Sequence, residues 1–142
     1  MGSEMCIRDS VRTDFGKREE DHSMRLYNTT VMYDVGKMLL AGGGEPAVNT
    51  AMTIDLNGSA PIITPIESMT YARSMQNSVV LPDGKVLVIG GTSVGKQFSD
   101  SGTQMIPEMW DPKTGQWSVL APQNVPRNYH STALLLLSLI HI

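Results

Sequence analysis

The stretch RSMQNSVVLPDGKVLVIGG, from Arg73 to Gly91, decides the fold because the chain contains it in more than one copy. An earlier copy, RLYNTTVMYDVGKMLLAGG, runs from Arg25 to Gly43 and aligns without a gap at an offset of 73 − 25 = 48 residues. A third copy, RNYHSTALLL, starts at Arg127, which lies 127 − 73 = 54 residues further along. The sequence therefore predicts a chain assembled from repeats of one small structural unit.

Each repeat consists of short apolar runs separated by turn residues, which is the pattern of antiparallel strands. A unit of roughly 50 residues with short strands and a Gly-Gly doublet is typical of a kelch-type propeller blade. The fold class that we predict is all-β: about two four-stranded antiparallel blades plus the first strand of a third. We expect strands at residues 29–33, 37–41, 49–56, 61–65, 77–81, 85–89, 105–110 and 116–120.

The predicted organisation also includes two tails that are unrelated to the repeat. A propeller has about four to eight blades, so we expect the remaining blades to belong to a larger protein. The tails MGSEMCIRDS and LSLIHI show no strand pattern, and the alternative is that they are irregular natural termini. The expected parts are a non-native tail at 1–10, a charged linker at 11–24, blades at 25–71 and 72–122, the start of a third blade at 123–136, and a non-native tail at 137–142.

The composition limits the classes of partner and site that the chain can have. Apolar residues make up 41% of the chain and the net charge is −3, so there is no basic patch that would favour nucleic acid. The apolar run near the C-terminus is too short to span a membrane, and the first residues lack the apolar run of a signal peptide. A single cysteine, Cys6, offers neither a disulfide framework nor a thiolate metal cluster. We therefore expect no nucleic-acid and no membrane partner.

The third copy contains the residues that are the best candidates for metal binding or catalysis. All three copies keep the arginine, but a histidine follows only in the third, at His130 beside Tyr129. Adjacent residues on a regular strand point to opposite faces, so the two could bind one metal only at the lip of the first strand, where the repeat places them. Imidazole suits copper, and a bound cation stabilises a phenolate. The alternative is that Tyr129 packs with its hydroxyl bonded and that His130 is an ordinary polar residue.

Four stretches point to a known family: VMYDVGKMLLAGG, YARSMQNSVVLPDGKVLVIGG, PEMWDP and RNYHSTALLL. Together they resemble the propeller of the galactose oxidase family of copper-radical oxidases, which includes the glyoxal oxidases. The resemblance covers residues 28–136. It implies a secreted, extracellular enzyme with a copper cofactor, which oxidises a small primary alcohol, aldehyde or carbohydrate with O2 and releases H2O2.

The resemblance also implies roles for particular residues. Tyr129 would be the axial copper ligand and the catalytic base that takes the substrate proton, and His130 would be an equatorial copper ligand. A further histidine and a tyrosine cross-linked to a cysteine are expected outside this chain, since Cys6 does not match. The aromatic of the family's substrate pocket corresponds to Phe98, although this side chain could instead cover apolar surface.

Some positions depart from the pattern of the family. Met75 and Gln76 stand where the sugar oxidase of the family has an aromatic and a histidine, which makes galactose itself doubtful as a substrate. We keep both as weak substrate-binding candidates. The alternative function is a kelch propeller that serves as a protein- or carbohydrate-binding scaffold, and a third possibility is a propeller enzyme that has lost its copper. The chain alone is expected to be inactive, because half of the implied ligand set lies outside it.

Overall fold

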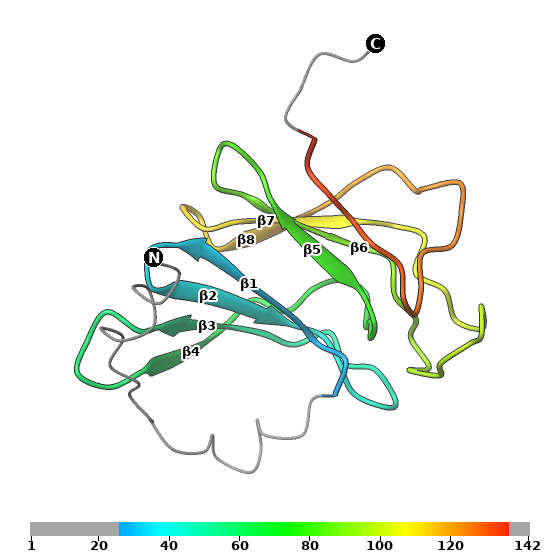
Figure 1. Ribbon diagram of the computed structural model, residues 1–142, viewed down its shortest axis with the longest axis horizontal. Coiled ribbons are helices and arrows are strands. Elements are labelled where there is room, and N and C mark those ends of the chain that lie inside the picture. The colour runs from blue at the N-terminus through cyan, green and yellow to red at the C-terminus, as the bar shows by residue number, and fades with distance from the viewer. Residues whose placement is uncertain (1–25, 137–142) are drawn as a thin grey trace, which may run out of the picture.

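The computed structural model describes residues 26–136 (Figure 1). The expected tails, the charged linker at 11–24 and Arg25 lie outside the described residues. Within the described range the chain forms eight strands and no helix. Consequently, this part of the chain contains no helix that is long and apolar enough to cross a membrane.

The strands form two separate four-stranded sheets, each with its strands in chain order and antiparallel throughout. The first sheet contains β1 (Thr29–Asp34), β2 (Lys37–Ala41), β3 (Ala51–Asp55) and β4 (Ile62–Ile66). The second sheet contains β5 (Asn77–Val80), β6 (Val86–Ile89), β7 (Glu108–Asp111) and β8 (Gln116–Val119). The prediction of an all-β chain with two four-stranded antiparallel blades is confirmed.

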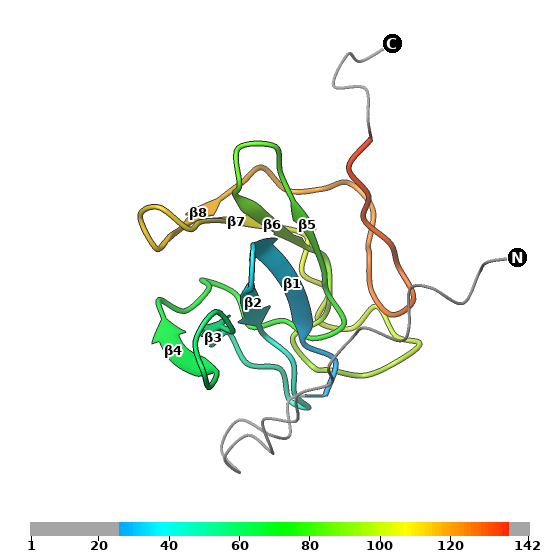
Figure 2. The ribbon, with the colours of Figure 1, turned by 60° about the vertical axis from the view of Figure 1, so that its left-hand side comes forward.

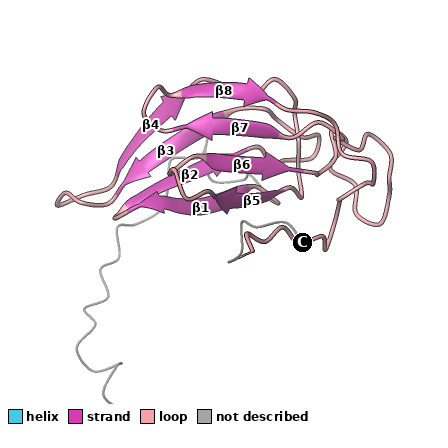
Figure 3. Cartoon of the chain, turned by 90° about the horizontal axis from the view of Figure 1, so that it is seen from above, coloured by secondary structure: helices cyan, strands magenta, loops and turns pink. Residues whose placement is uncertain are grey.

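The two sheets pack against each other, with their first strands, β1 and β5, adjacent (Figure 3). The hydroxyls of Thr29 in β1 and Ser78 in β5 share a hydrogen bond of 2.5 Å. Between the sheets, Tyr33 meets Trp110 edge-on with 4.9 Å between the ring centroids. The buried core contains residues from both sheets and from the segment that joins them: Leu39, Ala41, Ala51, Met69, Val86, Val88 and Trp110.

The Gly-Gly doublet has the same role in both blades. Gly43 N donates to the carbonyl of Arg73 at 2.8 Å, and the equivalent Gly91 N donates to the carbonyl of Arg127 at 2.7 Å. A Cβ on Gly90 would overlap this Arg127 carbonyl. Glycine is therefore required where the chain of the next copy passes, as the sequence indicates.

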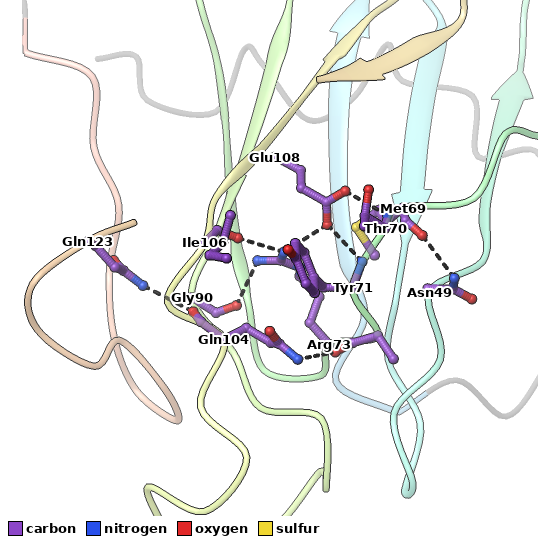
Figure 4. Close-up of polar contacts among 11 residues, drawn as sticks. Asn49, Met69, Thr70, Tyr71, Arg73, Gly90, Gln104, Ile106, Glu108 and Gln123 are labelled. Atoms are coloured by element: carbon purple, nitrogen blue, oxygen red, sulfur yellow. Dashed lines mark hydrogen bonds and ion pairs between the residues drawn. The ribbon is translucent and has the colours of Figure 1, made fainter. Parts of the chain in front are cut away.

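A buried ion pair joins β7 to the segment between the sheets (Figure 4). Arg73 Nη2 lies 2.8 Å from Glu108 Oε1, and both side chains are fully buried. The other oxygen of Glu108 accepts from Thr70 N at 2.6 Å, and Arg73 Nη1 donates to Gly90 O at 3.2 Å. Burial lowers the pKa of Arg73 while the charge of Glu108 opposes that change. In the second copy, Arg73 thus fixes the glycine doublet that binds the chain of the next copy.

The start of the third copy departs from the expectation. Residues 131–136 form no strand, because a strand requires a ladder of backbone hydrogen bonds and this segment has none with the described residues. The segment nevertheless lies beside β5 (Figure 2), where Asn77 Nδ2 donates to Ser131 Oγ at 2.8 Å. The expected third blade is thus represented here only by a chain segment against the second sheet.

Candidate metal and substrate site

Phe98 is presented by a loop that is closed at its base. The loop spans residues 92–103, and Thr92 forms a backbone bridge with Thr103. Ser93 N donates to Gly102 O at 2.8 Å, and Thr92 Oγ1 donates to Ser101 O at 2.7 Å. At the far end Phe98 has a left-handed φ of 52° and its side chain is 84% exposed. We call this segment the Phe98 loop.

Tyr129 and His130 lie together on a turn that precedes the segment beside β5. Ser131 N donates to Asn128 O at 3.0 Å, and His130 has a left-handed φ of 63°. The two rings are stacked, with 3.8 Å between their centroids and 25° between their planes. Tyr129 is half-buried and His130 is exposed. We call residues 128–131 the Tyr-His turn.

The Phe98 loop and the Tyr-His turn bring three of the predicted site residues together. The Phe98 ring meets Tyr129 edge-on with 4.9 Å between centroids, and its centroid lies 6.4 Å from that of His130. An open hollow of about 310 Å³ lies between the two segments. Its lining combines these aromatic rings with polar groups: Phe98, Ser99, Asp100, Asn128, Tyr129 and His130. A concave surface with aromatic walls and a few polar groups can hold a small organic molecule.

Asn128 is a residue of this hollow that the sequence reasoning missed. Its Nδ2 donates to Asp100 Oδ1 and Thr103 Oγ1, both at 2.9 Å, and to Ser99 O at 3.4 Å. The same comparison of copies that singled out His130 could have found it. The corresponding positions hold Leu26 and Ser74, so only the third copy has an amide there.

Met75 and Gln76 do not line the hollow. Met75 is 8% exposed, and its backbone N donates to Tyr27 O at 2.9 Å. Gln76 is 7% exposed, and its Nε2 donates to Ala41 O at 2.7 Å. In the described chain both residues therefore join the second sheet to the first, and their substrate-binding role stays a prediction.

The donor set fits copper in chemistry but supplies only part of a site. Tyr129 offers a phenol oxygen and His130 an imidazole nitrogen, and imidazole is a common copper ligand. Among residues 26–136 there is no group of three or more His, Cys, Asp or Glu side chains that could hold a metal ion. A complete copper centre would need further ligands from outside the described residues.

Comparison with known proteins agrees with this geometry. The family model described as the glyoxal oxidase N-terminus matches residues 34–139. The chain belongs to the galactose oxidase and glyoxal oxidase family. Among family members, galactose oxidase of Gibberella zeae is 33% identical over 134 residues, which cover 85% of this chain and 20% of that protein. Aldehyde oxidase GLOX of Vitis pseudoreticulata is 31% identical over 123 residues, which cover 83% of this chain and 23% of that protein.

A solved structure of the family extends the likeness to three dimensions. It is a fungal alcohol oxidase in complex with copper, with a TM-score of 0.77 and 37% sequence identity. The match covers 84% of this chain and 27% of that one. The chain therefore spans between about a fifth and about a quarter of the length of the family members that it matches.

Proposed function

We propose that the whole protein is a copper-radical oxidase that oxidises primary alcohols or aldehydes, including those of small carbohydrates, with O2 and releases H2O2. The observation that carries the proposal is the stacking of Tyr129 on His130 against Phe98 at an open hollow. The named activities of relatives, which are galactose, aldehyde and alcohol oxidases, support it.

The residues of this chain would have three tasks. Tyr129 Oη and His130 would hold copper, and Tyr129 would accept the proton of the substrate hydroxyl. Phe98 would form an apolar wall beside the substrate carbon. Copper, when bound, supplies positive charge that stabilises the phenolate and a centre that accepts electrons. A cross-linked tyrosine and cysteine and a further histidine would come from outside this chain.

The proposal extends to the setting of the protein. The two blades would belong to a closed kelch-type propeller whose remaining blades cover the second sheet. The whole protein would be secreted, with neither a nucleic acid nor a membrane as a partner. The 142-residue chain alone would not turn over alcohol, because the ligand set is incomplete within its described part.

The Tyr129→Phe variant of the full-length protein tests the catalytic assignment. Loss of a general base lowers kcat by about 10²- to 10⁴-fold, measured as H2O2 formed from a primary alcohol by the copper-loaded protein. Tyr71→Phe is the matched control, since Tyr71 is a half-buried tyrosine that does not line the hollow. Full activity in Tyr129→Phe would contradict the role of Tyr129.

The full reading frame provides an independent test of the reaction class. A cysteine and a tyrosine in upstream blades and a histidine downstream would complete the copper site. A full-length protein that lacks them and forms no H2O2 with copper would refute the oxidase and favour a binding propeller. Binding to an array of carbohydrates and proteins would then be the next measurement.

A further inference from the structure

We propose that Asn128 is a positioning residue that holds the Tyr-His turn against the Phe98 loop and thereby sets the width of the substrate hollow. Nothing in the repeat demands an amide here, since the other copies have Leu26 and Ser74. Only the kinetic part of this inference rests on the proposed oxidase function.

The amide of Asn128 has a defined orientation. Ser99 O and Asp100 Oδ1 can only accept hydrogen bonds, so the nitrogen of the amide must face them. The hydroxyl of Thr103 donates to Asp100 O at 2.7 Å, which leaves it free to accept from Asn128 Nδ2. The nitrogen therefore faces acceptors alone, and a group that cannot donate would not replace it.

These contacts are the link between the two walls of the hollow. Among residues 26–136, every hydrogen bond found between the Phe98 loop and residues 127–131 comes from the Asn128 side chain. The loop is closed at its base by Thr92 and Thr103, so it offers a firm anchor. On the other side, the bond from Gly91 N to Arg127 O holds the residue that precedes Asn128. The chain is thus fixed at two adjacent residues, Arg127 and Asn128, immediately before Tyr129.

The link controls the spacing of the aromatic rings. Ser99 is bonded to Asn128 and follows Phe98, while Tyr129 follows Asn128. The edge-on contact of Phe98 with Tyr129, at 4.9 Å between centroids, is therefore flanked directly by the amide. Without the amide the rings can separate, and the hollow loses the shape that orients a small alcohol. The expected effect falls on substrate binding more than on the proton transfer itself.

Asn128→Ala in the full-length, copper-loaded protein tests the kinetic consequence. We expect KM for a small primary alcohol to rise about tenfold, because the net free energy of one hydrogen bond corresponds to about that factor. The change in kcat should be smaller. Asn124→Ala is the matched control, because Asn124 is an exposed asparagine in the same connecting segment and does not line the hollow. An unchanged KM in Asn128→Ala would overturn the inference.

A donor–acceptor swap separates positioning from a general structural role. Asn128→Asp places a carboxylate against Asp100 and should raise KM more than Asn128→Ala does, since like charges then face each other. Adding Asp100→Asn restores one donor and one acceptor in reversed order, and the hydroxyl of Thr103 can turn to donate. The double variant should reverse the part of the KM increase that comes from the two facing charges, while the contact of Asn128 Nδ2 with Ser99 O stays lost. A double variant no better than Asn128→Asp would overturn the proposal.

Amide hydrogen exchange of the copper-free full-length protein gives a readout independent of turnover. Asn128→Ala should speed exchange in residues 93–102 and at Ser131, whereas Asn124→Ala should not. If the wild-type protein forms no H2O2 but exchange still rises in Asn128→Ala, the proposed function is wrong and the positioning role of Asn128 is supported. If the protein is an oxidase and neither exchange nor KM responds to Asn128→Ala, the positioning role is wrong and the proposed function is supported.

Discussion

Two ion pairs with the same N···O distance show how burial decides what a charged residue contributes. Arg73 and Glu108 are fully buried and 2.8 Å apart, whereas Lys85 and Asp83 are also 2.8 Å apart but lie at the surface. An exposed pair competes with water and contributes little to stability. A buried pair leaves an uncompensated charge when one partner is removed.

Glu108→Gln should destabilise the protein by about 3–5 kcal/mol, because Arg73 then remains as an unpaired buried cation. The NH2 group of the glutamine would also face a backbone or guanidinium N–H that now donates to Glu108, such as Thr70 N. Urea denaturation of the full-length protein measures the change. Asp83→Asn is the control and should leave the urea midpoint almost unchanged. Equal effects of the two variants would contradict the role of burial.

At the same scale, the sequence predicts those site residues whose chemistry is unusual for their place in the repeat. His130 and Tyr129 could be predicted because the other copies lack the pair, and Phe98 because of the family resemblance. Asn128 also differs from the other copies, but its role could not be predicted, since that role depends on the path of a loop some 25 residues earlier in the chain. Loop paths follow from tertiary contacts and not from local patterns.

At the scale of elements, the strands were predictable because apolar runs and turn residues act locally. Pro82-Asp83-Gly84 marks the turn between β5 and β6, where Gly84 has a φ of 85°. The third copy has equally good strand residues but no ladder. Strand propensity alone does not provide the neighbouring strand whose hydrogen bonds define a sheet. Pairing is thus the part of the fold that local sequence leaves open.

Gly90→Ala should be more damaging than a substitution at another left-handed glycine. Gly90 has a φ of 72° and Gly115 a φ of 73°, so alanine meets the same backbone strain at both, about 1–2 kcal/mol per residue. Of these two glycines, only Gly90 would place the new Cβ on a backbone atom, the carbonyl oxygen of Arg127, whereas at Gly115 nothing lies within 4 Å. Gly90→Ala should therefore displace Arg127 and weaken the Gly91–Arg127 hydrogen bond.

Two measurements on the full-length protein check this comparison. Thermal denaturation should show a larger loss of stability for Gly90→Ala than for Gly115→Ala. Turnover should also fall in Gly90→Ala, because Arg127 lies two residues before Tyr129, while Gly115→Ala should keep its rate. Equal stability losses with equal turnover would show that the chain of the third copy tolerates displacement there.

At the scale of the whole molecule, β6 in the second sheet is apolar on both faces. Val86 and Val88 are fully buried against the first sheet, and the pleat turns Leu87 and Ile89 to the opposite face. On that face they line a hollow of about 270 Å³ together with the segment that follows Thr132. A sheet covered on both sides needs apolar residues at consecutive positions. We therefore expect another layer to pack on this face in the whole protein.

Leu87→Ala tests whether such a layer exists. If a further blade covers the outer face, Leu87 is a core residue and its truncation should cost about 2–5 kcal/mol in the full-length protein. Val119→Ala in β8 is the control, since Val119 is 50% exposed in the described chain, and a surface substitution there should change stability by no more than about 0.5 kcal/mol. Urea denaturation of both variants gives the comparison. In the 142-residue chain, by contrast, Leu87 is only half-buried, so the same truncation should cost less there than in the full-length protein. Equal costs in the two proteins would mean that nothing packs on this face and that the propeller does not continue beyond the second blade.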